Sequence, residues 1–212
     1  MQTVSVASDG AEAARAALDR TVHEGGVVIY PADTLYALGC DPLDSGAIAR
    51  IHELKGRDEG KPSAVMFFSP LAMRELVATL GPATRDVVGA LMPGPVTLVL
   101  HNPEHRYPLA CREDPERLGV RLIEGPFEGA RSAVFQTSAN RSGEPAPYRF
   151  EDVDPEIRDG VELAIDGGVL GGTPSTVVDL TAIDAGGGWS LLREGALPAE
   201  EVERRLARVG RG

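Results

Sequence analysis

Three basic residues lie within one short segment, and their grouping points to anion binding. Lys55 and Lys61 are the only lysines among the chain's 21 basic residues, and Arg57 lies between them. Grouped cations of this kind hold phosphate or carboxylate groups. The segment resembles a P-loop, but its glycines are one residue too close and Pro62 stands where a Ser or Thr is required. The cations also follow a predicted helix, whose negative C-terminal end they would complement. The glycine-rich turn and the buried strand after it favour an anion site.

Polar turns at the ends of predicted strands form a second group of candidates. They are Pro31 to Thr34, Thr137 to Asn140 and Pro174 to Thr176. Taken singly, each is typical of turns, because Ser, Thr, Asp and Asn bond their own backbone. Strand ends are also where ligands bind in α/β sheets. Together with Arg121 in a strand and Arg193 at a strand end, the turns predict a polar concave site with a cationic wall. Arg121 has apolar neighbours and needs a partner, for which a bound carboxylate or phosphate is one candidate.

The histidines and cysteines do not form a predicted metal site. His101 to His105 matches the H-x-x-E-H zinc pattern, but Pro103 would interrupt the helix that this pattern requires. We therefore expect these two histidines to lie on a surface loop.

His23 and His52 fall in two amphipathic helices, where we expect them to be partly exposed. Cys40 and Cys111 have no second ligand at metal-binding spacing and are expected to be buried as small hydrophobic residues.

Composition and charge limit the class of protein. The chain has 212 residues, 42% of them hydrophobic, and a formal net charge of −11. This length can bury a core without disulfides, and the acidic balance argues against a broad basic surface for nucleic acid. No apolar run approaches the roughly 20 residues that cross a bilayer, and the first residues do not read as a secretion signal. We expect a cytoplasmic protein with no membrane segment.

Strand and helix patterns alternate along the chain. Ser8 and Asp9 are expected to cap a helix over 11–23, and the strand over 27–30 is expected to lead through a loop to a helix capped by Asp44. Further helices are predicted over 71–80, 83–91 and 198–209, and further strands over 64–68, 96–101, 118–122, 133–136, 162–165, 176–180 and 189–192. The pattern predicts one α/β domain, residues 1–212, with a mixed sheet. The irregular stretch 138–148 is long enough to act as a lid.

Several segments, read in order, resemble the YrdC-like family of threonylcarbamoyl-AMP synthases from about Val27 to Gly195. They are YPADTLYALGCDP, RIHELKGRDEGKP, PGPVTLVL, GVRL, TSANRSGEPAP, STVVDL and LLREGAL. The resemblance implies a twisted mixed sheet with flanking helices around an open cavity. It also implies an enzyme that converts ATP, L-threonine and bicarbonate into threonylcarbamoyl-AMP and pyrophosphate, with Mg²⁺ carried on the ATP. The product would feed tRNA modification, with tRNA or a downstream tRNA-modifying transferase as a partner.

The resemblance also implies a role for individual residues. Arg57 and Lys61, with Lys55 nearby, would hold the triphosphate and support catalysis. Asn140 and Arg193 would complete the ATP site. The threonine and its carbamate would be held by Thr34, Arg121, Ser138 and Ser175. Two anions must meet for the reaction, so fixed cations and positioning would supply most of the catalysis.

The chain departs from the usual pattern at four places. Ala32 and Ala37 replace a threonine and a glycine of P-T-[DE]-T-x-Y-G-L, Met66 stands where a histidine is common, and GVRL is followed by Ile123 and Glu124 in place of a proline. A thioether cannot replace an imidazole as a strong hydrogen-bonding group. These changes resemble the YciO branch. A YciO-like enzyme with another acyl or carbamoyl substrate, and an RNA-binding module, are therefore the alternatives.

Overall fold

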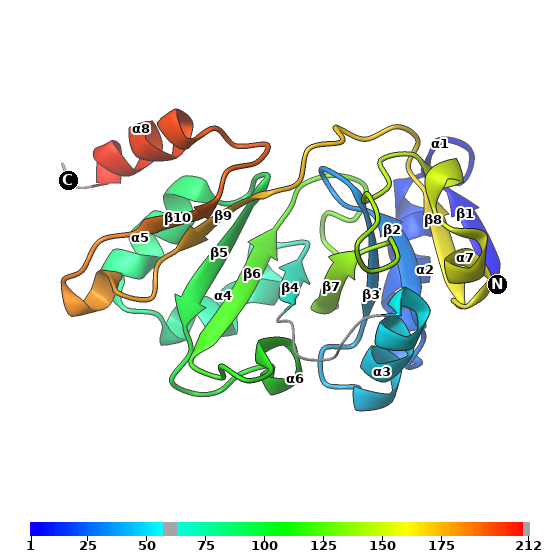
Figure 1. Ribbon diagram of the computed structural model, residues 1–212, viewed down its shortest axis with the longest axis horizontal. Helices are drawn as coiled ribbons and strands as arrows, with labels where there is room; N and C mark the ends of the chain where they lie inside the picture. The colour runs from blue at the N-terminus through cyan, green and yellow to red at the C-terminus, as the bar shows by residue number, and fades with distance from the viewer. Residues whose placement is uncertain (57–62, 210–212) are drawn as a thin grey trace.

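The computed structural model describes residues 1–56 and 63–209. Ten strands of these residues form one mixed sheet in the order β1-β8-β2-β3-β7-β4-β6-β5-β9-β10 (Figure 1). Their bounds are β1 Gln2–Ser5, β2 Val28–Pro31, β3 Tyr36–Cys40, β4 Ala64–Phe67, β5 Val96–His101, β6 Arg117–Leu122, β7 Val134–Ser138, β8 Leu163–Asp166, β9 Thr176–Asp179 and β10 Ser190–Arg193. Neighbouring pairs include both parallel strands, such as β4 and β6, and antiparallel strands, such as β2 and β3. The predicted α/β class with a mixed sheet is confirmed.

The helices flank this sheet. They are α1 Val6–Asp9, α2 Ala11–His23, α3 Ser45–Lys55, α4 Pro70–Thr79, α5 Pro82–Leu91, α6 Pro108–Cys111, α7 Pro155–Asp159 and α8 Ala199–Val209, with short 3₁₀ turns η1 Phe150–Asp152 and η2 Ile183–Ala185. In Figure 1, α2 lies behind the N-terminal half of the sheet and α3 in front of it, while α8 lies at the β10 end. No helix in the described ranges has the length and apolar character needed to span a membrane.

The two faces of the sheet are covered differently. On one face, residues such as Ile29 and Val65 pack in a core with α3, α4 and α5. On the other face, Val28 and Met66 pack in a second core with α2. Side chains two positions apart on a strand share a face, so Ala64 lies on the same face as Met66. The α2 core ends near Met66, and Ala64 lines an open cavity instead.

Most predicted elements are confirmed, because their hydrophobic period was clear. The helix over 11–23 and the strand over 96–101 have the expected bounds, and the Asp44 carboxylate accepts hydrogen bonds from the N–H groups of Gly46 and Ala47 at the start of α3. The expected cap of α2 was wrong. Its N-cap is Gly10, and the Asp9 carboxylate instead accepts a hydrogen bond from the N–H of Ser5, the residue that precedes α1.

The expected loop after the strand at 27–30 was also wrong. Residues Tyr36–Cys40 form β3, which pairs with β2 and β7 in the centre of the sheet. All five residues are buried, so the segment has no alternation of polar and apolar side chains that would mark a strand. A Cβ at Gly39 would lie 2.3 Å from a methyl group of Val134, which explains the small residue there.

Candidate active site

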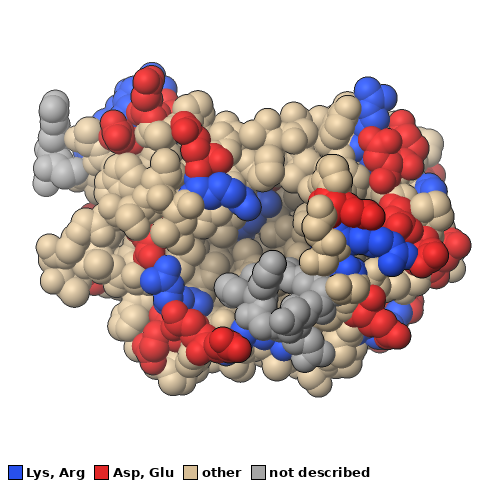
Figure 2. Space-filling view, viewed as in Figure 1, with Lys and Arg blue, Asp and Glu red and all other residues tan. Residues whose placement is uncertain are grey.

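The face covered by α2 is open beyond Met66 and carries there a cavity of about 580 Å³, within the size range of small-molecule sites. Its floor includes one row of residues that pair across four neighbouring strands, Gln136, Ala64, Gly119 and Val99. Ala64 and Gly119 are small, so the floor stays low at the middle of this row. Figure 2 shows the hollow near the centre of this face, with basic side chains on its wall.

Arg121 forms part of the inner wall of this cavity. It lies on β6, and its side chain is only 4% exposed. Its Nη2 donates a hydrogen bond to the Asp33 carboxylate, which comes from the turn between β2 and β3. The expected charge partner of Arg121 is thus supplied by the protein itself. Within the described residues, Nε of Arg121 and Oδ2 of Asp33 are buried without a hydrogen-bond partner.

Arg193 lies at the end of β10 and supplies a second cation to the cavity. Its Nη2 and Nε donate to the carbonyl oxygen of Ser175 at 2.8 and 3.2 Å. Partial burial and the nearby charge of Arg121 lower the pKa of Arg193. Two like charges that face one cavity repel each other, and an anion placed between them would relieve this repulsion.

Hydroxyl groups line the same wall. Ser175 is buried, and its Oγ lies 2.9 Å from Oγ1 of Thr97. Thr34 is also buried and faces the cavity from the β2–β3 turn. A close approach fixes the end of β10 here, because a Cβ at Gly195 would lie 2.2 Å from the carbonyl oxygen of Pro174.

The end of β7 brings Ser138 to the cavity, and the segment after it brings Asn140. The buried Lys55 ammonium donates to the carbonyl oxygens of both residues, at 2.6 Å to that of Asn140. The Lys55 carbonyl also accepts the N–H of Ser142, and Arg141 donates to the Asp154 carboxylate at 2.8 Å. The stretch 138–148, which the sequence predicts to be long enough for a lid, is therefore held by hydrogen bonds to Lys55 of α3 and to Asp154 at the start of α7.

Six of the nine predicted site residues line this single cavity. They are Thr34, Arg121, Ser138, Asn140, Ser175 and Arg193. Lys55 is not among the lining residues, because its ammonium points to the carbonyl oxygens of Ser138 and Asn140. Arg57 and Lys61 lie outside the described residues.

Other lining residues were not predicted, among them Thr97, Val99, Gly119 and Leu192. These four are small or aliphatic residues on strands, and only a known strand register would have placed them on the cavity side. The pairing of Asp33 with Arg121 leaves no local sequence signal, because the two residues are 88 positions apart.

The remaining histidines and cysteines lie away from this cavity. His101 and His105 are on the surface, as predicted, and both approach the Glu116 carboxylate, at 3.3 and 2.6 Å. The expectation for His52 was wrong. This residue is 2% exposed, because α3 packs its ring against Phe135 and because it contacts Arg112. Cys40 and Cys111 are buried and free, as predicted, and burial raises the pKa of the Cys111 thiol to about 11.

Comparison with known proteins decides the family. A family model named Sua5/YciO/YrdC, with the description "Telomere recombination", matches residues 20–195. The chain belongs to the Sua5/YciO/YrdC family. A threonylcarbamoyl-AMP synthase of Pyrococcus abyssi is 32% identical over 199 residues, which cover 89% of this chain and 56% of the relative. Another from Xanthomonas euvesicatoria is 34% identical over 160 residues, which cover 71% of this chain and 85% of the relative.

The structural comparison gives the same family fold. The crystal structure of Pyrococcus abyssi Sua5 in complex with L-threonine is similar to this chain with a TM-score of 0.82 and 29% identity. The similar region covers 97% of this chain and 61% of that protein. The chain thus spans just over half the length of its Pyrococcus relative and most of the length of its Xanthomonas relative. The predicted YrdC-like fold is confirmed.

Proposed function

We propose that this protein is an L-threonylcarbamoyladenylate synthase, which uses ATP, L-threonine and bicarbonate and releases pyrophosphate. One observation carries the proposal. Arg121 and Arg193 both face a single cavity on the open part of this sheet face of an acidic protein, beside serine, threonine and asparagine side chains. Such a cavity suits a ligand with more than one anionic group. The synthase names of the relatives from Pyrococcus and Xanthomonas support the same reading.

We assign the nucleotide to the Arg193 side of the cavity. Arg193 and Asn140 would contact ATP there. The side-chain amide nitrogen of Asn140 donates hydrogen bonds to the carbonyl oxygens of Arg141 and Glu144, at 2.8 and 2.7 Å. Its Oδ1 is then left as an acceptor, without a partner among the described residues. Arg57 and Lys61 would contact the triphosphate, on the basis of the sequence alone.

We assign the amino acid and its carbamate to the Arg121 side. Thr34, Ser138 and Ser175 would supply hydrogen bonds there, and Arg121 the positive charge. Lys55 would act indirectly, without contacting the substrates. By holding the carbonyls of Ser138 and Asn140, its ammonium would shape the segment that separates the two halves of the cavity.

The chemistry needs two bonds to form in turn. The amine of threonine adds to the carbon of bicarbonate, and loss of water leaves a carbamate. An oxygen of that carbamate then attacks the α-phosphorus of ATP in line, and pyrophosphate leaves. Both reactants of the second step are anions, so the arginines would lower their mutual repulsion and hold them in position. No side chain has to form a covalent intermediate in this scheme.

Magnesium would enter with the nucleotide. In the described ranges, no group of three His, Cys, Asp or Glu side chains is placed to hold a metal ion. The phosphate oxygens of ATP would supply most of the ligands, as is usual for Mg²⁺. The ion would neutralise charge on the leaving pyrophosphate.

The deciding experiment measures pyrophosphate release from ATP and bicarbonate with each amino acid in turn, with mass spectrometry of the adenylated product. We expect turnover with L-threonine and a product of the mass of threonylcarbamoyl-AMP. Turnover only with a different amino acid would support a YciO-like enzyme of other specificity. No turnover, together with salt-sensitive RNA binding in the absence of ATP, would favour the RNA-binding module.

We further propose that the protein works in the cytoplasm and that its product is consumed in tRNA modification. Threonylcarbamoyl-AMP is a mixed anhydride and reacts readily with nucleophiles, so a transferase that consumes it has to act on it soon after release. Adding tRNA and such a transferase to the assay should convert the adenylate into a modified nucleoside.

A further inference from the structure

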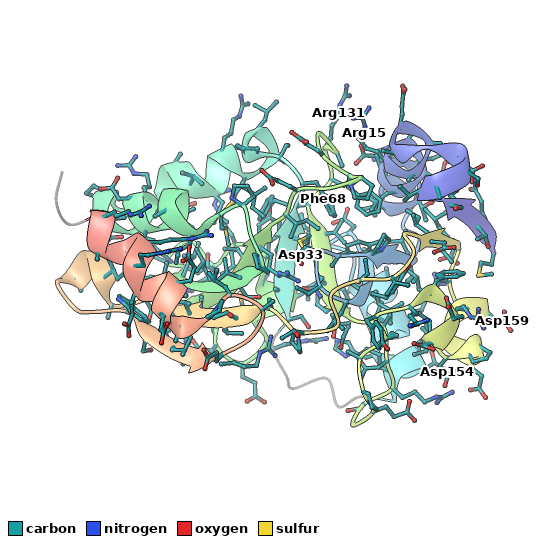
Figure 3. The ribbon with its side chains drawn as sticks, turned by 90° about the horizontal axis from the view of Figure 1, so that it is seen from above. Arg15, Asp33, Phe68, Arg131, Asp154 and Asp159 are labelled. Atoms are coloured by element: carbon teal, nitrogen blue, oxygen red, sulfur yellow. The ribbon has the colours of Figure 1, made fainter. Side chains whose placement is uncertain are left out.

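The Asp33–Arg121 pair has an unusual position relative to the cavity. Arg121 lines the cavity. Asp33 is not among the lining residues, and it contacts Arg121 from outside the cavity. In Figure 3, Asp33 lies near the middle of the molecule. Both side chains are well shielded, at 4% exposed for Arg121 and 18% for Asp33.

The surroundings of Arg121 give it no other carboxylate partner in the described part of the chain. Its neighbour in the sheet register is Met66, and the flanking residues of β6, Val120 and Leu122, are buried in the other core. A buried guanidinium without a partner is costly, and Arg121 also interacts with the like charge of Arg193, which lines the same cavity. Without Asp33, repulsion from Arg193 would favour other orientations of Arg121.

We propose that Asp33 is a positioning residue for the synthase reaction. Its carboxylate holds the Arg121 guanidinium in one orientation on the cavity wall, so that the N–H groups Asp33 leaves free are directed at the substrate anion. Asp33 itself does not touch the substrate. The inference deepens the proposed function and rests on it for its kinetic part.

A merely structural pair would behave differently. If Asp33 only offset the burial of Arg121, its removal would lower the stability of the fold and reduce the apparent kcat by the fraction of unfolded enzyme, a loss that circular dichroism would show, with every KM unchanged. A positioning role requires that the effect of Asp33 pass through Arg121. It also requires that kcat change more than the KM for ATP, because ATP is held on the other side of the cavity.

The test is a double-mutant cycle on the full chain. Asp33→Asn, Arg121→Gln and the double variant are compared for pyrophosphate release with saturating threonine and bicarbonate, after circular dichroism has verified folding. We expect Asp33→Asn to lower kcat at least tenfold and to change the KM for ATP less than threefold. In the Arg121→Gln background, the same change should alter kcat less than twofold. Asp33→Glu should restore part of the lost activity.

The matched control is Glu201→Gln on α8. Glu201 also pairs with arginine, at 2.7 Å from Nε of Arg205, but it is not among the residues that line the cavity. We expect its kcat to equal that of the unaltered protein. Equal factors for Asp33→Asn in both backgrounds, or an unchanged kcat, would overturn the positioning role.

A second readout separates this inference from the proposed function. In ¹⁵N-arginine NMR spectra, a fixed and buried Arg121 should give an Nε–H signal protected from exchange, assigned by its loss in Arg121→Gln. The signal should lose its protection in Asp33→Asn. If protection persists in Asp33→Asn, Asp33 does not hold Arg121, even in an active enzyme. If the unaltered protein shows no turnover, the proposed function fails, and the NMR result still decides whether Asp33 orients Arg121.

Discussion

At the scale of single residues, the cavity depends on side chains whose charges face one another. Arg193 shows this most directly, because its guanidinium is fixed by the Ser175 carbonyl and its pKa is lowered by partial burial and by Arg121. A group held in this way loses little conformational freedom when an anion binds, so much of its interaction energy is available for affinity.

We expect Arg193→Gln to raise the KM for ATP roughly 10- to 100-fold, because a hydrogen bond from a charged group contributes about 1.5–3 kcal/mol. The measurement is pyrophosphate release at varied ATP. Arg204→Gln, on the exposed side of α8, is the control and should leave the KM unchanged. Equal KM values for Arg193→Gln and the unaltered protein would remove Arg193 from the nucleotide site.

Gly195 follows β10 and tests how closely the chain there must approach Pro174 and Ser175, which precede β9. A methyl group there would lie 2.2 Å from the Pro174 carbonyl oxygen and 2.6 Å from the Ser175 carbonyl carbon. We expect Gly195→Ala to destabilise the fold by about 1–3 kcal/mol and to weaken ATP use, because the backbone must shift at the cavity wall. Gly188→Ala meets nothing within 4 Å and should be neutral in the same urea titration. Similar effects of the two changes would contradict the close approach.

At the scale of elements, a residue far along the chain completes the start of α5. The Asp184 carboxylate accepts hydrogen bonds from Oγ1 of Thr84 at 2.6 Å and from the Thr84 N–H at 3.2 Å. Gly81 is required beside it, because a Cβ there would lie 2.3 Å from the carboxyl carbon. Burial alone would raise the pKa of Asp184, but the hydrogen bonds outweigh it and lower the pKa below its ordinary value of 3.8.

We expect Asp184→Asn to lower the free energy of unfolding by about 1 kcal/mol at neutral pH, at the low end for a helix cap because the carboxylate is partly exposed. The folded-state pKa is depressed, so this stabilisation is present above pH 3.8 and is lost as pH falls through the lower folded-state value. Urea titrations of both proteins should therefore differ at pH 7 and converge below about pH 3.8. A constant difference across this range would show that the carboxylate charge contributes nothing.

The elements also show what the sequence could and could not predict. Periodic segments such as α2 and β5 were predicted with their bounds, because one face of each is apolar. The central strand β3 was missed, since a strand buried on both faces and rich in small residues has no alternation. For the site, residue types and turns identified six of the lining side chains. The contact between Asp33 and Arg121 could not be predicted, because it depends on how β2, β4 and β6 are ordered in the sheet.

At the scale of the whole molecule, we propose that residues 1–212 form one domain, because one sheet runs through all ten described strands. Circular dichroism and tryptophan fluorescence should then report one unfolding transition with the same midpoint. The single tryptophan, Trp189, lies next to β10, whereas most helical signal comes from elsewhere along the sheet. Two separate midpoints would instead indicate two units.

The net charge of −11 gives a second prediction at this scale. Repulsion among the acidic groups opposes folding, and salt screens it over a Debye length that falls from about 30 Å at 0.01 M to about 8 Å at 0.15 M. We therefore expect the melting temperature to rise between these two salt concentrations, measured by differential scanning fluorimetry. A lower melting temperature at 0.15 M would show that attractive ion pairs outweigh the repulsion.

The spread of the cavity lining along the chain has a consequence for synthesis. The lining begins at Ala32 and ends at Arg193, and its segments come together only as strands of one sheet. On the ribosome, a nascent chain lacks part of the wall until Arg193 has left the exit tunnel. Under the proposed function, we therefore expect the newly made protein to gain its affinity for ATP only after Arg193 has emerged from the ribosome.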